Sequence, residues 1–164
     1  FIPRLLAEAA IAQGLPVLTS ETHGVAERGG TVISHIKAGA FASPLIRAGQ
    51  ADGLLILKAE NVPLHGYFRR PGGWAAVDGA SGAEDFWAHD ATGTARTLGQ
   101  PRAANLVLLG FAIGRLAGAA EGAAGLLADR EALEKVLETR LAARPELAAA
   151  SRAALEAGYR AGAS

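Results

Sequence analysis

The sequence predicts a three-layer α/β sandwich with a mainly parallel sheet and C-terminal helices. Short β-branched or apolar runs fall in the first hundred residues, a helical pattern precedes them, and helical patterns dominate after them. Strands and helices in this order are typical of a sheet that is covered by helices. A length of 164 residues predicts a single domain over 1–164.

The N-terminal half is expected to hold one helix and three strands. Apolar residues recur at helical spacing from Ile2 to Ala10, and Gly14 is a good residue to end that helix. Strands are predicted over 16–20, 31–37 and 54–57. The last of these is a continuous apolar run, which is typical of a strand buried on both faces.

The C-terminal half is expected to be mostly helical. A weak helix is predicted over 59–70, a turn at 71–73 and a strand over 74–77, after which the pattern fades until a possible strand at 95–98. Strong helical patterns then follow over 105–117, 131–141 and 145–159, the last with Pro145 in its first turn.

Charge and composition exclude several classes of function. Sixteen basic residues balance sixteen acidic ones, so the chain lacks the positive charge that nucleic acids or anionic membranes would attract. No uncharged apolar stretch reaches 18 residues, which argues against a membrane span. The absence of cysteine excludes disulfides and thiolate ligands for an iron–sulfur cluster, and it favours a cytoplasmic location.

The first residues already have the apolar spacing of a helix, with no capping residue before it. The chain opens on Phe1 without an initiator Met, and the apolar pattern is at full strength from Ile2. We therefore expect that residues forming a strand and a glycine turn precede Phe1.

The densest polar segment, Ser20–Thr31, is the first candidate site. It is expected to leave the carboxyl end of a strand, where α/β sheets bind ligands. Arg28 precedes Gly29 and Gly30, which would let an anion approach both a guanidinium and the backbone. The alternative, favoured by composition alone, is an ordinary loop in which Glu21 pairs with Arg28. The candidate ligand- or partner-binding residues here are Glu21, Thr22, His23, Arg28, Gly29 and Gly30.

Arg102 and Asn105 form the second candidate site. They lie where the apolar helix over 105–117 is expected to begin. Asn105 could cap that helix or bond a neighbouring turn, and Arg102 could help the helix N-terminus to bind an anion. His23 and His35 lack the spacing of a metal site, and no serine lies in a nucleophile-elbow motif. We expect no catalytic residue and no metal ligand in this chain.

An ordered set of motifs resembles one family along almost the whole chain. The motifs are Glu21–Gly24, Arg28–His35, Ser43–Ile46, Ala51–Asp52, Gly99–Asn105 with Leu109–Gly110, and Ala157–Tyr159. Together they resemble the gamma subunit or domain of 2-oxoacid:ferredoxin oxidoreductases, and most of all the beta subunit of indolepyruvate oxidoreductases. The chain departs from the family pattern at Glu27, Lys58, Asn61 and Gln100.

The resemblance implies a Rossmann-like domain within a larger enzyme. Such enzymes oxidatively decarboxylate a 2-oxoacid, transfer the acyl group to coenzyme A and pass electrons to ferredoxin. Thiamine diphosphate and iron–sulfur clusters would then lie on partner chains, with coenzyme A a possible ligand of this one. The main alternative is a stand-alone nucleotide- or coenzyme-A-binding module that catalyses nothing. A dinucleotide-dependent dehydrogenase is less favoured, because no complete glycine fingerprint is present.

Overall fold

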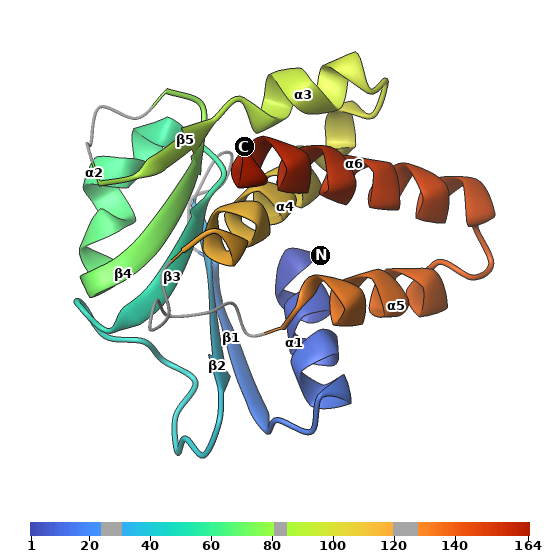
Figure 1. Ribbon diagram of the computed structural model, residues 1–164. Helices are drawn as coiled ribbons and strands as arrows, with labels where there is room; N and C mark the ends of the chain where they lie inside the picture. The colour runs from blue at the N-terminus through green and yellow to red at the C-terminus, as the bar shows by residue number, and fades with distance from the viewer. Residues whose placement is uncertain (24–30, 81–84, 120–127) are drawn as a thin grey trace.

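The computed structural model describes residues 1–23, 31–80, 85–119 and 128–164. Its strands are β1 (Val17–His23), β2 (Val32–Ala38), β3 (Ala51–Ile56), β4 (Arg69–Asp78) and β5 (Trp87–His89). Its main helices are α1 (Ile2–Ala12), α3 (Ala91–Thr97), α4 (Ala104–Ala117), α5 (Arg130–Arg140) and α6 (Pro145–Ala163). Figure 1 shows α4 in front of the sheet and the C-terminal helices α5 and α6 beside it.

The strands form two sheets. β3, β4 and β5 are parallel in the order β3-β4-β5, with Leu55 opposite Ala76 and Val77 opposite Ala88. β1 and β2 form an antiparallel pair in continuous register from Val17↔Ala38 to His23↔Val32. The predicted α/β class, with a mainly parallel sheet and C-terminal helices, is confirmed.

Burial in the parallel sheet depends on the position of each strand. The second half of β4 is buried from Trp74 to Asp78, because β4 lies between two strands and under α4. The prediction that 54–57 is buried on both faces is wrong. β3 is an outer strand of the described sheet, so Leu54 and Leu55 are half-buried and Leu57 is exposed.

Three local predictions differ from the structure. The weak helix predicted over 59–70 is present as three short helical pieces, the 3₁₀ helix Ala59–Asn61, the α-helix α2 (Val62–His65) and the 3₁₀ helix Gly66–Phe68, because Pro63 and Gly66 interrupt a longer helix. The predicted turn at 71–73 lies inside β4, where the pairing with β3 shifts register. Residues 95–98 were predicted as a strand but lie in and just after α3, whose N-terminus is capped by Asp90 through the backbone N–H of Gly93 (2.7 Å).

The central helical contact is that of α4 with α6, and four glycines allow it. Gly110 and Gly114 of α4 face Gly158 and Gly162 of α6, and all four are buried. A Cβ at Gly110 would overlap the carbonyl oxygen of Leu155, and a Cβ at Gly158 would overlap that of Val107. The two backbones therefore pack directly on each other, with no side chain between them at these points.

Helix α4 connects this contact to the sheet. It contacts α6 and also β3, β4 and β5, and its residues from Leu106 to Gly114 are all buried. Helix α1 contacts α5 and both strands of the antiparallel pair, with Leu5 and Leu6 inside the core. Within the residues that the structure describes, no helix has both the length and the apolar character needed to cross a bilayer.

The glycine contact predicts an unusual response to Gly→Ala substitution. Alanine normally favours a helix over glycine by up to about 1 kcal/mol. At Gly110 or Gly158 the new methyl group would push the helices apart, so each substitution is expected to lower the free energy of unfolding by about 2–3 kcal/mol. Urea denaturation followed by circular dichroism measures the change.

Gly118→Ala is the matched control. Gly118 follows α4 with a negative φ, and an added Cβ would lie 3.9 Å from its nearest neighbour, the carbonyl oxygen of Arg115. The control is expected to change the free energy of unfolding by less than about 0.5 kcal/mol. An equal loss at Gly110 and Gly118 would contradict close backbone packing as the reason.

Candidate functional site

The first candidate segment is only partly described. Glu21 and Thr22 are exposed and lie on β1 opposite Ser34 and Ile33, and His23 is the last residue of that strand. The strand predicted over 16–20 extends three residues further, because antiparallel pairing with β2 continues as far as His23. The other predicted residues of the segment, Arg28, Gly29 and Gly30, lie outside the described residues.

Glu21 lines an open hollow between α1 and β1. The hollow has a volume of about 470 Å³, and its wall is formed by Pro3, Arg4, Ala7, Glu8, Thr19, Ser20 and Glu21. Glu8 is also in an ion pair with Arg140 of α5, which compensates its charge. Among the described residues of the wall, Arg4 is the one cation, so this part of the hollow combines a guanidinium with hydroxyl groups and carboxylates. Such a wall suits a polar ligand or a polar partner surface.

The second candidate pair lies at the start of α4. Arg102 is exposed in the short 3₁₀ turn Pro101–Ala103, and Asn105 is half-buried in the first turn of α4. Asn105 is not the N-cap, because the 3₁₀ turn runs directly into the helix and gives that position to Ala103. Its Oδ1 accepts a hydrogen bond from the backbone N–H of Leu106 (2.9 Å). The prediction of a capping role is wrong.

The carboxyl edge of the parallel sheet holds polar residues that the sequence did not single out. Asp78 ends β4 and lies opposite His89, which ends β5. Both carboxylate oxygens of the buried Asp78 are hydrogen-bonded by Thr92: the backbone N–H donates to Oδ1 (3.0 Å) and the hydroxyl donates to Oδ2 (2.6 Å). Asp78 thereby ties the end of β4 to the first turn of α3.

His89 is partly buried at the same edge. Its ring stacks on Phe111 of α4 with 4.8 Å between centroids, and its Nε2 lies 3.2 Å from the hydroxyl of Thr94. Burial lowers the pKa of His89 below its usual value, although the carboxylates of Asp90 and Asp78 act in the opposite direction. The neutral ring is the favoured form. In the sequence, Asp78 could have been noticed as a carboxylate directly after a strand. The strand that ends at His89 could not, because the hydrophobic pattern over 78–100 is too weak to predict it.

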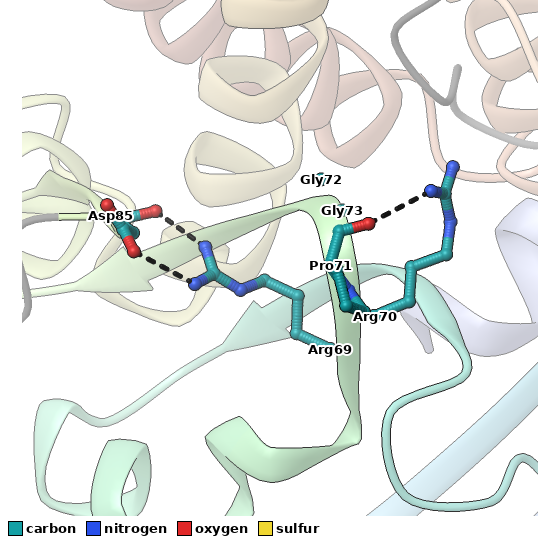
Figure 2. A pocket seen from close by; sticks show the side chains of 6 residues that line it. All are labelled: Arg69, Arg70, Pro71, Gly72, Gly73 and Asp85. Carbon is teal, nitrogen blue, oxygen red and sulfur yellow. Dashed lines mark hydrogen bonds and ion pairs between the residues drawn. The ribbon is translucent and has the colours of Figure 1, made fainter.

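Two arginines lie at the opposite end of β4 (Figure 2). Arg69 donates to the backbone oxygen of Asp85 (2.8 Å) and pairs with its carboxylate (3.5 Å), while Arg70 pairs with Asp52 (2.5 Å). With Pro71, Gly72 and Gly73 they line an open hollow of about 510 Å³. Both guanidinium charges are compensated, and parallel sheets bind ligands at the other end of their strands, so we interpret this corner as structural.

His35 has a structural role on β2. It is buried, its Nδ1 accepts a hydrogen bond from the backbone N–H of Ile46 (3.1 Å), and its ring meets the edge of Phe68 with 5.4 Å between centroids. Burial, helped by the nearby charge of Lys37, lowers the pKa of His35 below its usual value. In the part of the chain that the structure covers, no three His, Asp or Glu side chains are grouped so as to hold a metal ion.

A family model decides the relationship of the chain to known proteins. The model described as pyruvate ferredoxin/flavodoxin oxidoreductase matches residues 1–161. The chain belongs to this oxidoreductase family. A curated relative, the indolepyruvate oxidoreductase subunit IorB of Archaeoglobus fulgidus, is 46% identical over 54 residues. That match spans 33% of the present chain and 27% of the relative.

Solved structures of oxidoreductases share the fold of this family member. The gamma subunit of a keto/oxoacid ferredoxin oxidoreductase from Geobacter sulfurreducens gives a TM-score of 0.73 at 23% identity, over 98% of this chain and 88% of that one. The pyruvate oxidoreductase subunit PORC of Thermotoga maritima gives 0.69 at 23% identity, over 96% and 86%. A 2-oxoglutarate:ferredoxin oxidoreductase from Magnetococcus marinus gives 0.70 at 20% identity, over 98% of this chain and 28% of that chain.

The lowered pKa values of His35, which is buried, and His89, which is partly buried, predict a stability that depends on pH. Because the pKa of each is lower in the folded chain than in the unfolded chain, the unfolded chain binds protons more readily, and acid favours unfolding. The free energy of unfolding is expected to hold above about pH 6.5 and to fall as the pH drops below that value. Urea denaturation at pH 7.5, 6.5 and 5.5 measures the slope.

The double variant His35→Gln/His89→Gln isolates the contribution of the histidines. Glutamine can still accept a hydrogen bond but does not titrate, so the variant is expected to show a shallower loss of stability between pH 6.5 and 5.5. His65→Gln is the matched control, because it makes the same substitution at a histidine of the short helix α2 (Val62–His65), apart from the contacts of His35 and His89. An unchanged slope in the double variant would contradict this assignment.

Proposed function

We propose that this chain is the small, non-catalytic subunit or domain of a 2-oxoacid:ferredoxin oxidoreductase. The observation that carries the proposal is the family match over residues 1–161, which is supported by the likeness of fold to a gamma subunit. In the proposed reaction a 2-oxoacid loses carbon dioxide, its acyl group is transferred to the thiol of coenzyme A, and two electrons pass to ferredoxin. Indolepyruvate or another aryl 2-oxoacid is the proposed substrate class, on the basis of the IorB match.

The redox cofactors are proposed to lie on partner chains. An iron–sulfur cluster needs thiolate ligands, and this sequence contains no cysteine. We assign thiamine diphosphate and the clusters to partner subunits, with ferredoxin meeting the assembly through them. The contribution of this chain is then to hold a partner surface in place and to present polar groups to coenzyme A or to a partner chain.

We retain the segment from Glu21 to Gly30 as the proposed contact region. It begins on β1 at the hollow that Arg4, Glu8 and Glu21 line, and it contains Arg28, which is suited to bidentate binding of a phosphate or a carboxylate. Arg102 and Asn105 are proposed as a second contact near the start of α4. The first proposal rests on residue chemistry and on the hollow, because β1 belongs to the antiparallel pair, to which the preference of ligands for the carboxyl edge of a parallel sheet does not apply. The second rests on residue chemistry and on its place at the start of α4.

Reconstitution with the partner chains tests the proposed function. The purified chain alone is expected to show no 2-oxoacid oxidation. Combined with the thiamine-diphosphate-binding and iron–sulfur chains encoded in the same genome, it is expected to support reduction of ferredoxin that requires coenzyme A. A panel of indolepyruvate, phenylpyruvate, pyruvate and 2-oxoglutarate is expected to rank the aryl acids first by kcat/KM. Equal turnover by the partner chains without this subunit would favour an independent ligand-binding module instead.

Arg28→Ala tests the proposed contact region in the reconstituted complex. Loss of one charge-assisted contact costs on the order of 1.5–3 kcal/mol, which corresponds to a rise of about tenfold or more in the KM for coenzyme A or in the Kd between subunits. Arg144→Ala is the control, because Arg144 is exposed just before α6. A fall in thermal stability alone would show a structural loop, and no change at all would show that the site lies elsewhere.

A further inference from the structure

The connection between β2 and β3 is a long irregular segment. β2 ends at Ala38 and β3 begins at Ala51, so residues 39–50 form neither helix nor strand. In Figure 1 this segment leaves the lower end of β2 and returns to β3 at the lower left of the molecule. From residue 40 to residue 50 only Pro44 and Ile46 are half-buried, and the others are exposed. Because the segment buries so little apolar surface, its conformation depends on a few specific hydrogen bonds.

One side chain holds the middle of this segment. At the two ends, backbone hydrogen bonds of 2.8 Å attach the N–H groups of Gly39 and Gly49 to neighbouring parts of the chain. Between these ends, the backbone N–H of Ile46 donates to Nδ1 of His35 (3.1 Å). Among the hydrogen bonds of the described residues, this is the one that joins the stretch between Gly39 and Gly49 to another element. The conformation of that stretch therefore depends on the imidazole of His35.

The hydrogen bond between His35 and Ile46 requires an unprotonated ring nitrogen. His35 is buried on β2, and its ring meets the edge of Phe68 with 5.4 Å between centroids. Because Nδ1 accepts the N–H of Ile46, the neutral ring carries its hydrogen on Nε2. The imidazolium form has hydrogen on both nitrogens, so its Nδ1–H would point at the N–H of Ile46. A proton and the hydrogen bond compete for the same lone pair.

The groups around His35 keep its ring neutral at pH 7. Cations lie on β2, in the segment and directly after Phe68: Lys37, Arg47 and Arg69. Burial, together with the charge of Lys37, lowers the pKa of His35 below its usual value. Arg69 is paired with Asp85 (3.5 Å), and Ser20, which lies opposite His35 on β1, does not titrate. The hydrogen bond to Ile46 is therefore intact at neutral pH, and acid is needed to break it.

We propose that His35 is a pH-dependent switch that holds residues 39–50 in one conformation when its ring is neutral and releases the middle of that segment when its ring is protonated. Release breaks the hydrogen bond to Ile46 and exposes Pro44 and Ile46 to solvent, while the two ends stay attached. In the released form the ring is hydrated and binds a proton more readily, so acid shifts the equilibrium toward release. The switch is independent of the proposed function, because all of its parts belong to this chain.

Amide hydrogen exchange followed by NMR measures the opening of the segment. After correction for the intrinsic exchange rate at each pH, the protection of the Ile46 amide is expected to fall at least about threefold between pH 7.5 and pH 5.5. The amide of Leu109, which is buried in α4, is the internal reference for opening of the core. It is expected to lose less protection than Ile46 over the same range.

Two variants of His35 separate the hydrogen-bond acceptor from the proton. His35→Gln keeps an acceptor that does not titrate, so the protection of the Ile46 amide is expected to be the same at both pH values. His35→Phe keeps a ring of similar size without an acceptor, so protection is expected to be low already at pH 7.5. His89→Gln is the matched control, because it removes the other histidine whose pKa is lowered, and it is expected to lose Ile46 protection in acid as the wild type does. Thermal unfolding at pH 7.5 shows whether each variant is folded.

The wild type alone can overturn the inference, whether or not every variant folds. Equal protection of Ile46 at pH 7.5 and pH 5.5 would overturn it. A fall at Ile46 that Leu109 matches would also overturn it, because the segment would then open only with the whole chain. In the variants, a fall that persists in His35→Gln, or wild-type protection in His35→Phe, would show that another group holds the segment.

Discussion

The direct contact between the backbones of α4 and α6 is the constraint on which the rest of the structure depends. Gly110 and Gly114 meet Gly158 and Gly162, and any side chain at these positions would occupy the space of a carbonyl group on the other helix. Small residues offer few side-chain atoms for packing. The close approach of the two backbones compensates for this, because it increases the dispersion contact along the helices. It also fixes how far α6 stands from the sheet, because α4 lies against all three parallel strands.

Other parts of the molecule take their positions from this helix pair. On the sheet side, Phe111 of α4 stacks on His89, and Arg115 lies over the ring of Trp87 at 5.4 Å from its centroid. On the outer side, Glu156 of α6 pairs with Arg130 of α5, and Arg140 of α5 pairs with Glu8 of α1. Contacts thus run from the carboxyl edge of the parallel sheet to the helix beside the antiparallel pair. The ion pairs are partly exposed, so they orient the helices more than they stabilise them.

The polar and apolar surfaces have separate places in this arrangement. Asp78 and His89 at the carboxyl edge are occupied by internal contacts with Thr92, Thr94 and Phe111. The hollow beside Glu21 is open, and several large apolar side chains, Phe41, Leu45, Leu64 and Tyr67 among them, are exposed elsewhere on the described surface. A subunit without cysteine that serves a redox enzyme needs such contact surfaces more than it needs reactive groups, which agrees with the proposed function.

The sequence by itself determined the class of fold, the strong helices and the family. The helical patterns over 2–10, 105–117, 131–141 and 145–159 are local in the sequence, and each begins within one residue of a helix start in the structure. Such a pattern arises wherever one face of a helix is buried. It could not show that β1 pairs with β2 as an antiparallel hairpin through His23, that 95–97 is helical, or that Asp78 and His89 end neighbouring strands. These features depend on strand pairing between residues that are distant in the sequence, or on helix capping in segments whose hydrophobic pattern is weak. Only the tertiary structure decided them, because the partner that satisfies each hydrogen bond is chosen by the packing of the whole chain.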